Sequence, residues 1–119
     1  MTSLDNSRAI AFNILKRYFT SKRLLTDLIS KEFENKDISN LDRRFIYYLS
    51  KGVIRYYLFL DHCISIFSNK KLKNIDQNIL IILRMGLYQI IFMDKVHNYS
   101  AVDESVKLAK RKESIKSSK

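Results

Sequence analysis

Residues 79–93, ILIILRMGLYQIIFM, are the stretch that decides the fold of this chain. A helix needs about 17–25 apolar residues to cross a bilayer, and this run is shorter than that. It is also interrupted by Arg84, Gly86 and Gln89. We therefore predict a buried helix at the centre of a soluble core and no membrane-spanning segment.

The scarcity of chain breakers points to an all-α fold around that helix. The 119 residues include no proline and only two glycines, Gly52 and Gly86, so the residues that usually form hairpins and tight turns are nearly missing. No part of the sequence shows the sustained alternation of a strand. The length and the 46% hydrophobic content suit one domain with one core, which we expect to cover residues 1–119.

The charge balance suggests a polyanionic partner. Lysine and arginine number 22 against 12 acidic residues, a formal net charge of +10 at pH 7. Nucleic acid fits this excess better than an acidic membrane surface. The alternative is that an AT-rich genome simply favours lysine codons. No basic segment followed by an apolar core opens the chain, so we expect a cytoplasmic protein without a secretory signal.

Catalytic and metal-binding chemistry find little support. The single cysteine, Cys63, and the separated His62 and His97 do not match the spacing of a zinc site. No G-x-G-x-x-G loop, P-loop or G-x-S-x-G motif is present. We predict a non-enzymatic chain with no metal and no cofactor.

Amphipathic patterns predict two helices in the N-terminal third. The first has Asn6 or Ser7 as its N-cap. The second covers about residues 24–33, with Thr20 or Ser21 near its start. The polar residues that follow, up to Asn40, are expected to form a loop.

The rest of the chain predicts three or more further helices. One starts near Asp42, and a separate one contains Leu60, Ile64 and Phe67. Asp76 is the expected N-cap of the central helix. A last helix opens at Ser100 with an S-x-x-D capping box. The sum is a bundle of about five or six helices.

Five residues are unusual in these helical patterns. Glycine costs about 1 kcal/mol relative to alanine inside a helix, so Gly52 and Gly86 suggest a close approach of helix backbones. Arg55, Asp61 and Arg84 are charges among apolar neighbours in the sequence, and buried charges need partners. We favour an internal Arg–Asp tie or a snorkelling side chain over contact with a ligand.

Basic residues occur in groups along the chain, and each group alone is a weak signal. If the first and last helices lie side by side, their cations would form a stripe for phosphates. The groups are Lys16-Arg17, Lys22-Arg23, Arg43-Arg44, Lys70-Lys71-Lys73 and residues 107–112.

Several motifs together resemble the NusB-like fold. The most specific are LR-x-G-x-YQ at residues 83–89 and AV-x-E-x-V-x-LAK at residues 101–110, which includes Glu104. The segments GVIR at residues 52–55 and Leu60-Asp61 and an opening R-x-x-A-x-x-x-L from Arg8 also fit. The match covers nearly the whole chain and implies a helical RNA-binding module.

Within this fold, the chain looks closest to the N-terminal domain of the RsmB/Sun family of ribosomal RNA cytosine-5 methyltransferases. Gln89 and the arginine that closes GVIR tilt the comparison away from the NusB antitermination branch. The catalytic half of such an enzyme uses a Pro-Cys nucleophile, which a chain without proline cannot contain. The family usually has a proline near His97 and one more helix after residues like 112–119, so we expect the domain to lack its final helix.

The resemblance implies two sets of important residues. Arg55, Asp61, Arg84, Gly86 and Glu104 would specify the fold. The RNA-facing role would fall on the first and last helices, at Arg8, Lys16, Arg17, Lys107, Lys110 and Arg111.

Three functions remain open on the sequence alone. The first is a module that docks a C-terminal methyltransferase domain on ribosomal RNA. The second is a free-standing antitermination factor that binds single-stranded leader RNA with a small ribosomal protein. The third is a protein-interaction or dimerisation bundle whose charge is incidental. The RNA target, the oligomeric state and the extent of the natural chain past Lys119 do not follow from the sequence.

Overall fold

The computed structural model describes residues 3–34 and 36–93, with side chains from Asn6 onward, and every regular element in these ranges is helical. This confirms the predicted all-α class. The chain divides into two compact units, residues 1–88 and 89–119. The elements are α1 (Ser3–Ser21), α2 (Leu25–Phe33), α3 (Asn40–Ser68), a 3₁₀ turn η1 (Leu72–Asn74), α4 (Gln77–Tyr88) and a π-helical segment η2 (Gln89–Met93).

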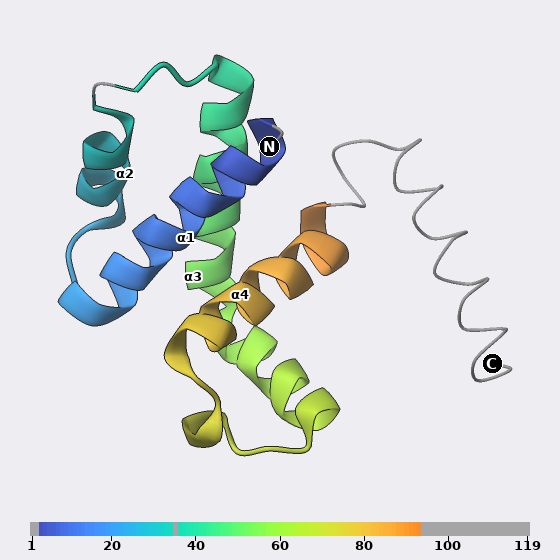
Figure 1. Ribbon diagram of the computed structural model, residues 1–119. Helices are drawn as coiled ribbons and strands as arrows, with labels where there is room; N and C mark the ends of the chain where they lie inside the picture. The colour runs from blue at the N-terminus through green and yellow to red at the C-terminus, as the bar shows by residue number, and fades with distance from the viewer. Residues whose placement is uncertain (1–2, 35, 94–119) are drawn as a thin grey trace, which may run out of the picture. The chain divides into compact units, whose positions relative to one another are not determined.

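In the first unit, α3 is the long helix against which the others are arranged. Both α1 and α4 pack on α3 and on each other, and α2 packs on α1 (Figure 1). The apolar side chains at these contacts are fully buried, and each contributes about 1.5–3 kcal/mol relative to an exposed position. The core includes Ile14, Leu15, Ile46, Leu49, Leu60 and Ile81.

The third and fourth predicted helices are one helix. α3 runs through 29 residues, and only Tyr56 departs from helical geometry, with φ −112° and ψ 16°. The separate helix expected around Leu60 is therefore the second half of α3, after this kink. Phe67 shares the helical face of Leu60 and Ile64 by its spacing but is 80% exposed, one residue before α3 ends at Ser68.

The predicted N-terminal caps were wrong. α1 begins at Ser3, so Asn6 and Ser7 lie inside the helix, and Ser7 is buried. Ser21, expected near the start of the second helix, is the last residue of α1, and its hydroxyl donates to the Arg17 carbonyl oxygen at 2.6 Å. Hydroxyl side chains bond equally well to a carbonyl one turn back, which the sequence pattern does not distinguish.

The predicted cap of the central helix is confirmed. The Asp76 carboxylate accepts hydrogen bonds from the backbone N–H groups of Asn78 and Ile79, at 3.0 and 3.2 Å. However, α4 buries only one face, and Ile79 and Ile82 are more than half exposed. The predicted burial of this helix therefore applies to one face within residues 77–88, which includes Leu80, Ile81 and Met85. No helix among the described residues is long and apolar enough to cross a membrane.

The helix predicted from Ser100 lies outside the described residues, as do Glu104, Lys107, Lys110 and Arg111. Its expected position beside the first helix, and the single domain expected over residues 1–119, stay predictions.

Candidate nucleic-acid interface

One side of α1 presents a polar, basic surface. Asn13, Lys16, Arg17 and Thr20 are all exposed, and their spacing of three, four and seven positions places them on one helical face. We call these four residues the α1 face. The Thr20 hydroxyl donates to the Lys16 carbonyl oxygen at 2.8 Å, so it is held against the helix. The α1 face can offer two cations and an amide to a phosphate backbone.

Arg8 does not belong to the α1 face. It is half-buried, and it precedes Arg17 by nine positions, which is about two and a half helical turns. The two side chains therefore leave α1 on opposite sides. The structure brings Lys16 and Arg17 together, and it places Arg8 at the border of the core.

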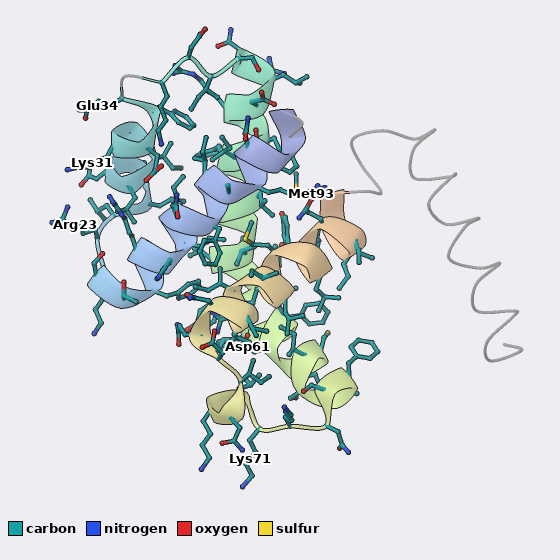
Figure 2. All side chains as sticks on the ribbon, in the orientation of Figure 1. Arg23, Lys31, Glu34, Asp61, Lys71 and Met93 are labelled. Atoms are coloured by element: carbon teal, nitrogen blue, oxygen red, sulfur yellow. The ribbon has the colours of Figure 1, made fainter. Side chains whose placement is uncertain are left out.

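Arg84 and Asp61 form an internal salt bridge, which is one of the two interpretations that the sequence favoured. Arg84 Nε donates to Asp61 Oδ1 at 2.7 Å, and Arg84 Nη2 donates to Asp61 Oδ2 at 2.9 Å. Both residues are buried, so the pair links α4 to the second half of α3 in a region of low polarity. Figure 2 labels Asp61 near the crossing of these two helices.

Aromatic rings complete the surroundings of Arg84. Its guanidinium carbon lies 4.6 Å from the ring centre of Phe19 and 5.5 Å from that of Tyr57. These contacts are within the range of cation–π attraction. Arg84 Nη1 is buried without a hydrogen-bond partner among the described residues. The site is packed by α1, α3 and α4 and serves the fold, since the Arg84 charge is already matched by Asp61.

Gly52 is needed where Tyr88 packs on α3. A Cβ atom added at Gly52 would fall on the Tyr88 phenol ring. The Tyr88 ring also stacks on Tyr56, with 6.3 Å between ring centres and 24° between planes. The close approach predicted for Gly52 is therefore to an aromatic side chain and not to a helix backbone. Nothing in the spacing of the sequence identified Tyr88 as the group that fills this gap.

Two of the predicted fold-specifying residues differ from expectation. At Gly86 an added Cβ would meet nothing within 4 Å among the described residues, so no close approach explains this glycine. Arg55 is exposed, so it needs no internal partner. Its guanidinium carbon lies 5.5 Å from the ring centre of Tyr56, the residue at the kink.

Burial of Tyr88 has an electrostatic consequence. Burial raises the pKa of the Tyr88 phenol above its ordinary value of 10.0, the nearby Tyr56 raises it further, and Arg55 opposes both. The phenol therefore stays neutral across the physiological range.

Within residues 3–34 and 36–93, no group of three or more His, Cys, Asp and Glu side chains could hold a metal ion.

Comparison with known proteins assigns the chain to a family. A model of the NusB family matches residues 5–119. The transcription antitermination protein NusB of Clostridium acetobutylicum is 31% identical over 105 residues, which cover 87% of this chain and 78% of that protein. The protein of the same name from Acetivibrio thermocellus is also 31% identical over 105 residues, covering 72% of its length.

A methyltransferase also matches, over a smaller share of its length. A probable ribosomal RNA small subunit methyltransferase B of Synechocystis is 32% identical over 106 residues, which are 88% of this chain but 24% of that enzyme. No solved structure matches significantly. Both branches of the predicted resemblance are therefore found, with the antitermination proteins matched over most of their length. This chain belongs to the NusB family.

Proposed function

We propose that this chain is a NusB-type antitermination factor that binds single-stranded RNA in the cytoplasm together with a small ribosomal protein. The observation that carries the proposal is the match to transcription antitermination proteins over most of their length. This favours the antitermination branch over the methyltransferase branch that the sequence motifs had suggested. The net charge of +10 agrees with a polyanionic partner.

The α1 face supplies the proposed first contact with RNA. Lys16 and Arg17 are adjacent, exposed and flanked by polar side chains, so phosphates can approach them without displacing packed residues. Arg8 is assigned a secondary role at most, because it leaves α1 on the other side. Lys107, Lys110 and Arg111 remain proposed RNA contacts on the strength of the family resemblance alone.

A salt titration of RNA binding tests this proposal. For single strands, the logarithm of affinity falls with the logarithm of salt concentration by about 0.7 for each phosphate neutralised. Lys16→Ala/Arg17→Ala should therefore flatten the slope by about 1.4. Lys70→Ala/Lys71→Ala removes the same charge from exposed residues far along the chain and serves as the matched control. Absence of RNA binding by the wild type at low salt would refute the function itself.

The ribosomal protein partner is tested by the same measurement. Adding it should raise RNA affinity markedly if the chain is an antitermination factor.

The second candidate, an RNA-docking domain of a methyltransferase, is favoured by the Synechocystis relative. That candidate predicts tight binding to a ribosomal RNA fragment with no gain from the ribosomal protein.

A third candidate rests on exposed apolar residues. Ile79, Ile82 and Leu83 are 52%, 56% and 40% exposed on α4, which suits a protein-interaction or dimerisation bundle. It predicts a mass that rises with protein concentration and no RNA binding at low salt. Sedimentation without RNA, beside the salt titration, separates it from the first two candidates.

A further inference from the structure

The outer side of α3 carries a line of cations with an aromatic ring among them. Arg44, Tyr48, Lys51 and Arg55 follow one another at spacings of four, three and four residues, and all four are exposed. This spacing places them on one face of the helix. We call these residues the α3 stripe. At 1.5 Å rise per residue, the stripe extends for about 16 Å along α3 before the kink at Tyr56.

The α3 stripe is a separate surface from the α1 face. The buried residues of this half of α3, including Ile46, Leu49 and Val53, lie about half a turn around the helix from the stripe. Because α1 and α4 pack on the buried side of α3, helical spacing turns Arg44, Tyr48 and Lys51 away from them, while Arg55 at the end of the stripe lies near the Tyr88 phenol of α4.

Along α3, the face that carries the stripe has no acidic residue of its own. Between Arg43 and Ser68 the sequence has one acidic residue, Asp61, and its carboxylate is already bound to Arg84. Asp42 precedes the stripe but lies on the other side of α3, two positions from Arg44. No carboxylate on this helix face therefore competes with an incoming anion for the three cations.

Aromatic rings support two of the three cations. Lys51 Nζ donates to the Tyr47 hydroxyl at 3.1 Å and lies 5.4 Å from the centre of that ring. Arg55 lies against the Tyr56 ring, as described above. Restricting a long side chain before binding lowers the conformational entropy that binding must remove. Tyr48 contacts the Tyr47 ring edge-on at 5.4 Å between centres and leaves half of its surface exposed.

We propose that the α3 stripe is a second binding surface for single-stranded RNA, in which Arg44, Lys51 and Arg55 contact phosphates and Tyr48 stacks on a base. Cations that track a backbone, with an exposed ring between them, are the combination that binds single strands without reading sequence. The inference rests on the proposed function only in taking RNA as the polyanion. Its residues are different from those of the α1 face, so the two can fail separately.

The first test compares two triple variants with equal charge. Arg44→Ala/Lys51→Ala/Arg55→Ala removes the stripe cations, and Lys70→Ala/Lys71→Ala/Lys73→Ala removes three exposed cations at the connection between α3 and α4. Binding of a short mixed-sequence single-stranded RNA is followed by fluorescence anisotropy across a salt series. We expect the stripe variant to lose about tenfold in affinity at low salt and to flatten the salt slope by about two. The control variant should retain nearly the wild-type slope.

The second test separates base stacking from phosphate contact. Tyr48→Ala should weaken RNA binding several-fold without changing the salt slope, because stacking releases no counterions. Tyr48→Phe keeps the ring and should bind as the wild type does. All these side chains are exposed, and far-UV circular dichroism with thermal unfolding verifies that each variant remains folded.

The outcomes that overturn the inference are specific. If the wild type binds RNA and both triple variants lose affinity equally, the effect is one of net charge and the stripe is not a site. A stripe variant that matches the wild type on RNA but loses binding to a polyglutamate peptide would make the stripe an acidic-protein surface. A wild type that binds no RNA refutes this inference and the proposed function together. If RNA affinity falls in Lys16→Ala/Arg17→Ala but not in the stripe variant, the stripe alone is refuted.

Discussion

The crossing of α3 with α4 and the outer face of α3 contain charged residues with opposite roles. Near the crossing with α4, the charges Asp61 and Arg84 are buried and bonded to each other. On the outer face of the same helix, Arg55 is exposed and lies beside a tyrosine ring. In the sequence both arginines have mainly apolar neighbours, so local composition does not distinguish them. They differ in which side of their helix faces the core.

The difference shows how a basic protein can use charge for two purposes. A buried charge contributes to the fold only through its partner, because taking it out of water is costly. An exposed charge contributes little to stability and is available to a ligand. The crossing of α3 and α4 is therefore expected to respond to mutation through stability, and the outer face through RNA binding.

Breaking the buried pair should give the largest effect. Arg84→Met leaves the Asp61 carboxylate buried without its partner, and we expect the free energy of unfolding to fall by about 3–5 kcal/mol. Urea denaturation followed by circular dichroism measures this loss. The double variant Arg84→Met/Asp61→Leu removes both charges and should recover most of it. A double variant as unstable as the single one would show that packing, not the unpaired charge, is responsible.

Filling the gap at Gly52 should give the next largest effect. Gly52→Ala places a methyl group where the Tyr88 ring lies, and we expect a loss of about 1–3 kcal/mol in the free energy of unfolding. Gly86→Ala is the matched control, because an added Cβ would meet none of the described residues within 4 Å, and it should stabilise by up to about 1 kcal/mol. Equal destabilisation by both substitutions would contradict the different roles assigned to the two glycines.

The titration of Tyr88 in α4 provides a further test, because Arg55 of the outer face acts on the pKa of its phenol. The folded protein holds the Tyr88 proton more tightly than the unfolded chain does, because burial raises its pKa above 10.0. This contribution to stability is complete below about pH 10 and is lost as the pH rises through the folded-state pKa. The urea midpoint should therefore fall between mildly and strongly alkaline pH, and it should fall less in Tyr88→Phe than in the wild type. An identical fall in both proteins would assign the alkaline instability to other groups.

The smallest effect on stability is expected on the outer face. Arg55→Ala should change the free energy of unfolding by less than about 0.5 kcal/mol at neutral pH, because the residue is exposed. The contrast with Arg84→Met is then a comparison of one residue type in two environments. A loss above about 1 kcal/mol would indicate that Arg55 is a fold-specifying residue after all, as the family motif suggested.

The sequence by itself determined the fold class, the first two helices and one cap. Their amphipathic patterns were sufficient because burial repeats with the period of the helix whatever the partner is, as the buried Ala11, Leu15 and Leu28 show. The Asp76 cap was predictable because it is a local bond between neighbours in the chain. The motifs, being long and specific, also identified the family.

Only the tertiary structure decided which charges and glycines are internal. The bond between Asp61 and Arg84 joins residues 23 positions apart, and the packing of Tyr88 on Gly52 joins two different helices. The half-burial of Arg8, and the exposure of Arg44, Lys51 and Arg55, also depend on which side of each helix meets the core. A sequence gives the spacing of side chains along a helix, but the rotation of that helix against its neighbours is fixed by packing between distant segments.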